Sequence, residues 1–260
     1  HSLACLSSKP KSACKFIAHN EDKDMPIYTV LVPLFQEANM VEPLMQSLSQ
    51  INYPIAQLEI FLICEAVDPL TTQAVAKRLQ PPFHLIVVPE GFPQTKPRAL
   101  NYALQFATGE LITIYDAEDR PHPNQLKTAL QAFHMNPDWA ALQAPLDYFN
   151  SRDSLITRQF ALEYAALFHV RIPFLARLEA PFPLGGTSNH MRRTALDKCG
   201  GWDAHNVTED ADLSFRLAAL GHTIGYIDCP TQEEAVSTYP EWVKQRSRWI
   251  KGFLKTWLVH

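Results

Sequence analysis

The chain of 260 residues carries 27 acidic and 23 basic side chains, for a formal net charge of −4, and 47% of its residues are apolar. This composition excludes a disordered chain, and the acidic balance argues against general nucleic-acid binding, which requires a basic face. No uninterrupted apolar run reaches the ~18 residues that a membrane-spanning helix needs. The five cysteines contain no Cys-x-x-Cys pair, which predicts reduced thiols rather than a zinc site or a disulfide framework.

Residues 1–25 mix small, polar and charged side chains without a period, so we expect a mobile N-terminal lead-in. His1 in place of Met suggests that the chain is an excised piece of a longer protein. From Ile27 onward, β-branched apolar runs alternate with helical stretches. Strands are predicted at 27–34, 58–64, 83–90 and 110–116, with helices near 39–50, 71–80 and 98–108. This alternation indicates an α/β fold with a mixed, mostly parallel, Rossmann-like sheet flanked by helices.

The alternation of predicted strands and helices becomes less regular after residue 120. A long helix is predicted from Ser154, and a later helix from Thr208 should end at Gly221, a good C-terminal stop. The remaining predictions are a helix at 123–135, a strand at 139–149, a loop at 181–193 and a last strand at 222–228. We expect one domain, residues 26–240, with a nucleotide-binding half at 26–120 and an acceptor half at 121–240.

Acidic side chains cluster where the predicted strands end. These are Glu37, Glu65, Asp68, Asp116, Glu118 and Asp119. Ligands of open parallel sheets bind beyond the carboxyl ends of the strands, and crowded carboxylates repel one another unless a cation or donor-rich ligand lies between them. A hard divalent ion takes carboxylate oxygens and completes its shell with phosphate oxygens. The alternative is that each acidic residue belongs to a solvated turn or caps a helix.

Three further groups of residues bear on function. Lys96 and Arg98 open a predicted helix, where side-chain cations and backbone amides face an anion. Glu209 and Asp210 also begin a helix, where a carboxylate can be a cap or a general base. Arg248 beside Trp249 could belong to a membrane face or clamp a pyrophosphate while the indole stacks on a sugar. Neither Gly-x-Gly-x-x-Gly nor a P-loop is present, which argues against dinucleotide and ATPase sites.

Taken together, these sequences resemble glycosyltransferase family 2, the inverting enzymes of GT-A fold, and within it the processive cellulose synthase-like branch. The resemblance runs from about Ile27 to Leu258. It rests on the order VPLFQE, ICEAVD, KPRALN, DAED, GGTSNH, TED and QRSRW. Two positions depart from the usual pattern: Glu65-Ala-Val-Asp68 stands where Asp-Asp is usual, and Asp116-Ala-Glu118 stands where Asp-x-Asp is commoner.

The resemblance implies a role for each matching residue. Pro33, Glu37, Glu65 and Asp68 would hold the nucleoside, and Lys96 would lie near the nucleotide phosphates. Asp116 and Glu118, with Asp119 sharing the task, would bind Mg²⁺ or Mn²⁺ and the diphosphate. Asp210 would be the general base, with Glu209 beside it, and Gln245, Arg248 and Trp249 would hold the diphosphate and form part of the acceptor site.

The resemblance also implies a reaction. A single displacement would transfer a hexose from a nucleotide sugar, with UDP-hexose as the expected donor, to a growing β-linked polysaccharide. Three alternatives stay open: a non-processive member that adds one sugar to a lipid or small acceptor, a catalytically silent nucleotide-binding domain, and a nucleotidyltransferase. The sequence does not identify the sugar.

The charge is unevenly distributed along the chain. Residues 241–260 hold five basic side chains and one acidic side chain, together with Trp242, Trp249, Phe253 and Trp257. A basic, aromatic helix is typical of a bilayer interface. We therefore expect a membrane-interface helix at 241–260, a catalytic domain on the cytoplasmic side of a membrane, and transmembrane helices outside this chain.

Overall fold

A seven-stranded sheet forms the centre of the computed structural model, which describes residues 25–260, so the predicted lead-in lies outside the described residues apart from Met25. All neighbouring strands in it are parallel except β8, which runs antiparallel to β4 and β6. In spatial order the strands are β3 (Phe83–Val88), β2 (Leu58–Glu65), β1 (Tyr28–Leu34), β4 (Leu111–Ile114), β8 (Asn189–Arg192), β6 (Trp139–Gln143) and β9 (Thr223–Tyr226). The predicted mixed, mostly parallel α/β sheet is confirmed.

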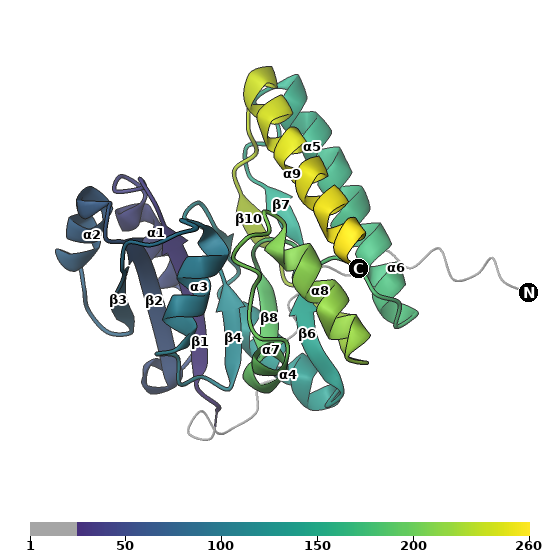
Figure 1. The fold of residues 1–260 in the computed structure, drawn as a ribbon, viewed down its shortest axis with the longest axis horizontal. Coiled ribbons are helices and arrows are strands. Elements are labelled where there is room, and N and C mark those ends of the chain that lie inside the picture. Colours follow the sequence, from purple (N-terminus) through teal and green to yellow (C-terminus); the bar gives the residue numbers. More distant parts are fainter. Residues whose placement is uncertain (1–24) are drawn as a thin grey trace, which may run out of the picture.

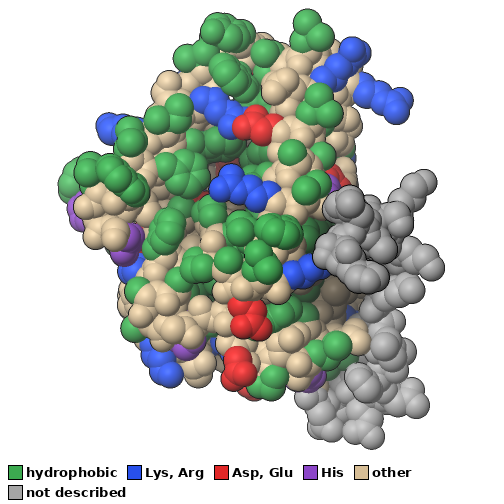
Figure 2. All heavy atoms as spheres, turned by 90° about the vertical axis from the view of Figure 1, so that its right-hand side faces the viewer, with side chains coloured by type: hydrophobic (Ala, Val, Ile, Leu, Met, Phe, Trp, Pro, Cys, Tyr) green, Lys and Arg blue, Asp and Glu red, His purple; other side chains and the backbone are tan. Residues whose placement is uncertain are grey.

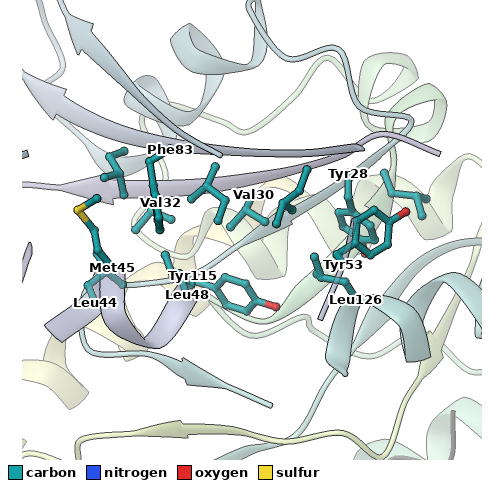
Figure 3. Packing of buried hydrophobic residues seen from close by; sticks show 14 of the residues in the cluster. Tyr28, Val30, Val32, Leu44, Met45, Leu48, Tyr53, Phe83, Tyr115 and Leu126 are labelled. Carbon is teal, nitrogen blue, oxygen red and sulfur yellow. The ribbon is translucent and has the colours of Figure 1, made fainter. Parts of the chain in front are cut away.

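Helices cover both faces of this sheet (Figure 1). One face packs on α1 (Val41–Leu48), α2 (Pro69–Ala76) and α4 (Gln125–Met135), and the other on α3 (Lys96–Leu104), α7 (Arg193–Lys198) and α8 (Glu209–Ala219). In Figure 3, the β1 side chains Val30 and Val32 face the α1 side chains Leu44, Met45 and Leu48 within one buried cluster. Because β1 is covered on both faces, it reads as an almost continuous apolar run.

A second, three-stranded sheet lies beside the first. Its strands are β5 (Arg120–Pro121), β10 (Thr231–Glu233) and β7 (Leu146–Tyr148), with β10 in the middle. Between β7 and β8 the chain forms α5 (Leu155–Ala166), a π-helical turn at Leu167–Arg171, and α6 (Ile172–Arg177). The last helix, α9 (Tyr239–Val259), lies alongside α5 and stands out from the sheet (Figure 1). A short 3₁₀ turn, Ile55–Gln57, precedes β2.

The predicted elements of the first half match the structure to within a few residues, whereas the second half requires corrections. The strand predicted at 139–149 is two strands in different sheets, because Pro145, which has no N–H for a ladder, lies between them. The loop predicted at 181–193 contains β8, and β5, β10 and α7 were not predicted. The helix stop is confirmed, since α8 ends just before Gly221, whose φ is +78°.

The polar strand β8 escaped prediction because it is buried through hydrogen bonds rather than through apolar side chains. The ring of His190 is fully buried, with Nδ1 2.6 Å from the Tyr28 hydroxyl and Nε2 3.2 Å from Gln125 Oε1. Gln125 in turn donates to the Cys229 carbonyl at 2.7 Å and to the Thr231 hydroxyl at 3.0 Å. Burial lowers the pKa of His190 to about 3, so the ring is neutral at physiological pH.

The cysteines depart in part from the prediction of reduced thiols. Cys64 and Cys199 are free. Cys229, fully buried in the core, is disulfide-bonded, so the prediction is wrong at this position.

Candidate active site

The strand order has a topological switch point between β1 and β4. The chain moves outward from β1 to β2 and β3 on one side, and to β4 on the other, so the direction of winding reverses there. Ligands of open α/β sheets bind at such a switch point, outside the carboxyl ends of the strands. β4 pairs with β1 only as far as Leu31, so the end of β1 near Pro33 has no neighbour on that side. The predicted site residues that follow β1 and β4 therefore lie at this switch point.

At the end of β1, Glu37 faces the acidic group that follows β4. Burial first, and then the charges of Glu118 and Asp116, raise the pKa of Glu37 to about 7, although the Phe35 amide that donates to its carboxylate opposes the shift. The preceding residue, Gln36, has φ of +60°, a strained conformation that occurs frequently at functional sites. Glu37 thus lies near the acidic turn after β4, close enough for the charges of Glu118 and Asp116 to act on it.

The two acidic residues at the end of β2 are already bound by the protein. Asp68 caps α2: one carboxylate oxygen accepts from the Thr71 amide at 3.2 Å and the other from the Gln36 amide at 2.6 Å. Burial would raise the pKa of Asp68, but these hydrogen bonds outweigh it and lower the pKa below its usual value. Glu65, 6% exposed, lies 3.4 Å from the Arg98 guanidinium.

Lys96 and Arg98, predicted together to face an anion, point to different places. Arg98 also donates to the Pro89 carbonyl and so lies over the loop that follows β3. Lys96 lies at the centre of the site, where its ammonium group pairs with Asp116 and donates to the Gly186 carbonyl at 2.9 Å. One lysine therefore connects α3, the end of β4 and the loop before β8. Burial opposes its charge, but Asp116 and Glu209 raise the pKa of Lys96 above its usual value, so it is a permanent cation.

The acidic turn after β4 divides into an open part and a buried part. Asp116 is partly exposed and Glu118 is exposed, whereas Asp119 is 1% exposed. One Asp119 oxygen accepts from the Asp116 amide at 2.7 Å and from the Thr187 hydroxyl, while the other, Oδ1, is buried and has no hydrogen-bond partner among the described residues. Burial and the charge of Asp116 raise the pKa of Asp119 well above its usual value.

This arrangement fits a divalent cation that shares its ligands with a diphosphate. Within residues 25–260, no three His, Cys, Asp or Glu side chains gather closely enough to hold a metal ion by themselves. Two accessible carboxylates, Asp116 and Glu118, lie close enough for their charges to act on Asp119, whose Oδ1 has no hydrogen-bond partner among the described residues. A hard cation accepts such an incomplete set when phosphate oxygens supply the remaining ligands.

Asp210 faces this centre from the start of α8. Its Oδ1 accepts from the Ala211 amide at 2.8 Å, and its Oδ2 makes no hydrogen bond within the described residues. A Cβ on Gly186 would lie 3.6 Å from Asp210 Oδ2 and 4.0 Å from Lys96 Nζ, so the glycine leaves space beside both groups. Burial, followed by the charge of Glu209, raises the pKa of Asp210 to about 7, and Lys96 moderates the shift. A carboxylate with this pKa and an open oxygen can accept a proton near neutral pH.

The helix-cap alternative holds in part for this turn, since Asp210 Oδ1 accepts from the first-turn amide of Ala211. Thr208 occupies the N-cap position of α8, yet its side chain makes no capping hydrogen bond. Its hydroxyl instead lies 3.3 Å from Asn206 Oδ1 and 3.3 Å from the Thr256 hydroxyl of α9. Glu209 is 8% exposed, and burial raises its pKa while Lys96 and Arg248 oppose the shift.

The comparison with known proteins decides the family. Residues 26–252 match the family model described as "Glycosyltransferase like family 2". The chain belongs to this family. The predicted family, its GT-A-like fold and the prediction of a glycosyltransferase are thereby confirmed.

Curated relatives of this glycosyltransferase carry names that refer to different products. The chain is 27% identical, over 99% of its length and 54% of the relative's, to a "Beta-monoglucosyldiacylglycerol synthase" of Nostoc sp.. It is 25% identical, over 94% of its length and 48% of the relative's, to "Glucomannan 4-beta-mannosyltransferase 2" of Arabidopsis thaliana. The chain thus spans about half the length of these curated relatives.

Solved structures agree on the fold. "Mannosyltransferase PcManGT from Pyrobaculum calidifontis in complex with GDP-Man and Mn2+" superposes with a TM-score of 0.69 at 21% identity, covering 93% of this chain and 66% of that chain. The S. aureus TarS 1-349 structure in complex with UDP-GlcNAc gives a TM-score of 0.59 at 16% identity, covering 81% of this chain and 60% of that chain.

In this glycosyltransferase, the predicted C-terminal residues lie on α9. Arg248 is exposed, and its charge acts on Glu209 of the proposed catalytic turn. Trp249 is half-buried against Phe160 of α5, with ring centroids 6.4 Å apart. Gln245 Oε1 is buried and lacks a hydrogen-bond partner in the described part of the chain. Within the described residues, no helix is long and apolar enough to cross a membrane.

Sequence reasoning missed Glu233, which lies in β10. The antiparallel register of β10 and β5 pairs Thr231 with Pro121 and Gln232 with Arg120, so Glu233 follows opposite Asp119. Burial and the charges of Asp119 and Asp116 raise its pKa well above the usual value. Its one sequence signal is the acidic pair Glu233-Glu234, which on its own indicates only a solvated turn.

Proposed function

We propose that this domain transfers a hexose from a nucleotide sugar to an acceptor hydroxyl with inversion at the anomeric carbon. The observation that carries the proposal is the open oxygen of Asp210, whose pKa is about 7, facing the Lys96–Asp116 pair across Gly186. A general base and an anion-binding centre so placed suit attack on one side of a sugar and departure of a phosphate on the other.

The donor would lie across the carboxyl ends of the first strands. Pro33, Glu37, Glu65 and Asp68 stand on the nucleoside side, and Lys96 and Arg98 begin the neighbouring helix α3. Asp116, Glu118 and Asp119 would hold a divalent ion, which when bound neutralises charge on the leaving diphosphate. The structures that contain GDP-Man with Mn2+ and UDP-GlcNAc support a metal and a nucleotide sugar, and UDP-hexose remains the predicted donor here.

The protein's own groups would perform the proton transfer. Asp210 Oδ2 accepts the proton of the acceptor hydroxyl while that oxygen attacks the anomeric carbon from the face opposite the diphosphate. Lys96 is fixed by Asp116 and by the Gly186 carbonyl, so its charge can stabilise the phosphate oxygens without moving far. One displacement needs no covalent intermediate on the enzyme and inverts the configuration.

The acceptor class follows from weaker signals. The Gln245-x-x-Arg248-Trp249 sequence supports the processive, polysaccharide-forming branch, as does the relative named glucomannan mannosyltransferase. The relative named monoglucosyldiacylglycerol synthase supports the alternative, a single transfer to a lipid. Both alternatives place the acceptor hydroxyl at Asp210 and differ in what lies beyond it.

A membrane surface is the proposed location of the acceptor end. Ile250, Leu254, Trp257 and Leu258 of α9 are between 55% and 76% exposed. Leu162, Val170, Phe174 and Leu178, from α5 to the end of α6, are between 60% and 69% exposed. Figure 2 views the molecule from this side, and hydrophobic side chains are spread over the face with Lys and Arg among them. Such a mixed surface favours the headgroup region of a bilayer.

The proposal is tested first by binding and then by transfer. UDP-glucose, UDP-GlcNAc and GDP-mannose, each with and without Mn²⁺, should give a metal-dependent rise in Tm for at least one donor. That donor should then be consumed with diacylglycerol in mixed micelles or with β-1,4-linked gluco- or manno-oligosaccharides, and mass spectrometry of the product length separates single from repeated transfer. Asp210→Asn should bind the donor and transfer nothing. A donor that binds without hydrolysis or transfer would indicate a silent nucleotide-binding domain instead.

A further inference from the structure

The helix α9 carries the proposed acceptor residues but has little buried surface of its own. Of its 21 residues, only Gly252 and Thr256 are fully buried. Trp242 Nε1 and Gln245 Oε1, in its first half, are buried without a hydrogen-bond partner among the described residues. The position of this half of the helix therefore depends on other contacts.

Arg246 supplies those contacts. Its guanidinium makes two hydrogen bonds to Glu163 of α5, at 2.7 Å to Oε1 and 2.5 Å to Oε2. The same guanidinium lies 4.7 Å from the ring centroid of Phe160, 4.9 Å from that of Trp249 and 5.8 Å from that of Trp242. A planar cation can form a bidentate carboxylate pair and stack on aromatic rings at once, which lysine cannot do. We call Arg246, Glu163, Phe160 and Trp249 the Arg246 clasp.

The second half of α9 is held at the proposed catalytic turn. Gly252 lies so close to Thr208 that a Cβ there would meet its Cγ2 at 2.5 Å and its Oγ1 at 2.7 Å. The Thr256 hydroxyl accepts from Asn206 Nδ2 at 2.9 Å. Thr208 immediately precedes Glu209 and Asp210, so this contact joins α9 directly to the residues proposed to act on the acceptor.

Arg248 and Trp249 thus lie on α9 between two fixed points, Arg246 with its pair to Glu163 of α5 and Gly252 with its contact to the turn before α8. Trp249 is itself part of the clasp, since its ring packs edge-to-face on Phe160 at an interplanar angle of 82°. A change at Arg246 would therefore alter the orientation of the indole and of the neighbouring Arg248. The Arg246 and Glu163 side chains are 20% and 42% exposed, so this pair is removable without opening a large cavity.

We propose that Arg246, with Glu163, is a positioning residue that holds Trp249 and Arg248 toward the acceptor side of the site. Arg246 acts through Trp249 and need not touch the substrate itself. The effect on catalysis rests on the proposed function, whereas the effect on Trp249 does not. Two experiments separate these parts.

The first experiment needs no activity. The protein is labelled with 5-fluorotryptophan, and the five ¹⁹F resonances are assigned by single Trp→Phe variants. Glu163→Gln and Arg246→Lys should shift the Trp249 and Trp242 resonances and leave that of the distant, buried Trp202 unchanged. Glu42→Gln is the matched control: it breaks an exposed Arg–Glu pair between α1 and the turn after α2, Arg78–Glu42 at 2.6 Å, in the other half of the domain. It should shift none of the three resonances. An unmoved Trp249 resonance in both clasp variants overturns the proposal.

The second experiment uses the donor and acceptor that the wild-type protein accepts in the screen described above. Arg246→Lys should lower kcat/KM for the acceptor by about tenfold or more, because a displacement of ~1 Å near the reacting groups can have this effect. The Kd of the nucleotide sugar, measured by calorimetry, should stay within about twofold, as misplacement of acceptor residues predicts. Equal losses in donor binding and acceptor kcat/KM would indicate general damage and overturn the positioning role. Wild-type kcat/KM in both clasp variants would also overturn it, whereas a wild-type protein that transfers no sugar contradicts only the proposed function.

Discussion

The carboxylates at the end of β2 and those near Lys96 differ in how far the protein itself provides their hydrogen bonds. In the nucleotide-binding half, Asp68 accepts hydrogen bonds from two backbone amides and Glu65 lies against Arg98. Near Lys96, Asp119 keeps a buried oxygen without a hydrogen-bond partner in the described residues. Asp210, which is partly exposed, uses only Oδ1 in a hydrogen bond there, and the pKa of each residue is raised. Buried polar groups in proteins are normally satisfied, so the unsatisfied ones identify the place where a ligand or a proton is missing.

The largest expected effect comes from Asp210, which uses only one of its carboxylate oxygens in a hydrogen bond within the described residues. Asp210→Asn should reduce sugar transfer by ~10³-fold or more, because an amide cannot accept the acceptor proton. The Kd of the nucleotide sugar should change less than about twofold, since Asp210 belongs to the acceptor side. Single-turnover transfer and calorimetry on the same preparation measure both quantities. Turnover near the wild-type rate would show that another group is the base.

Asp116→Asn should have the next largest effect. It removes a carboxylate of the proposed metal centre and the partner of Lys96, so the Mn²⁺-dependent part of donor binding should weaken by about 100-fold, as loss of a metal-site group does. Thermal shift with donor at several Mn²⁺ concentrations provides the measurement. If Asp116→Asn keeps the full metal dependence of donor binding, Glu118 and Asp119 hold the ion without Asp116.

The pH dependence tests the raised pKa of Asp210. The ionised form is the base, so kcat/KM should fall about tenfold for each pH unit below 7. The effect on stability has the opposite sign. The folded-state pKa lies above the unfolded value, so stability declines as pH rises from about 4 to about 7 and stays reduced above that range. Asp210→Asn should therefore raise Tm most at pH 8 and least at pH 4. A Tm difference that does not vary with pH would contradict a raised pKa of the Asp210 carboxyl in the folded protein.

The smallest expected effect comes from Asp68, whose two carboxylate oxygens both accept hydrogen bonds from backbone amides. Asp68→Ala removes the N-cap of α2 and should destabilise the fold by ~1 kcal/mol, with Asp68→Asn costing less because its amide oxygen can still accept one hydrogen bond. Chemical denaturation measures the difference, and calorimetry measures donor binding by each variant. If Asp68→Ala leaves stability unchanged and abolishes donor binding, Asp68 is chiefly a nucleoside ligand rather than a cap.

The sequence alone predicted the first half of the fold well. Local patterns decide there: each parallel strand is a short run of β-branched apolar residues, and each is followed by a helix of ordinary length. It also placed the acidic residues at strand ends, where the structure brings Glu37 beside the turn that follows β4. The order of short sequences around Asp116, Asp210 and Arg248 was enough to indicate the family.

Only the tertiary structure decided how the polar residues are used. β8 is buried because His190 finds partners on β1 and α4, which are distant in the chain, and no local pattern reports such hydrogen bonds. Asp68 and Glu65 resemble ligand residues in the sequence and prove to be bound by the protein, since the amides and the guanidinium that hold them approach only after folding. Periodicity within one segment determines whether it forms a strand or a helix, whereas which charges are left unpaired depends on contacts between segments. For this protein, those unpaired charges define the site.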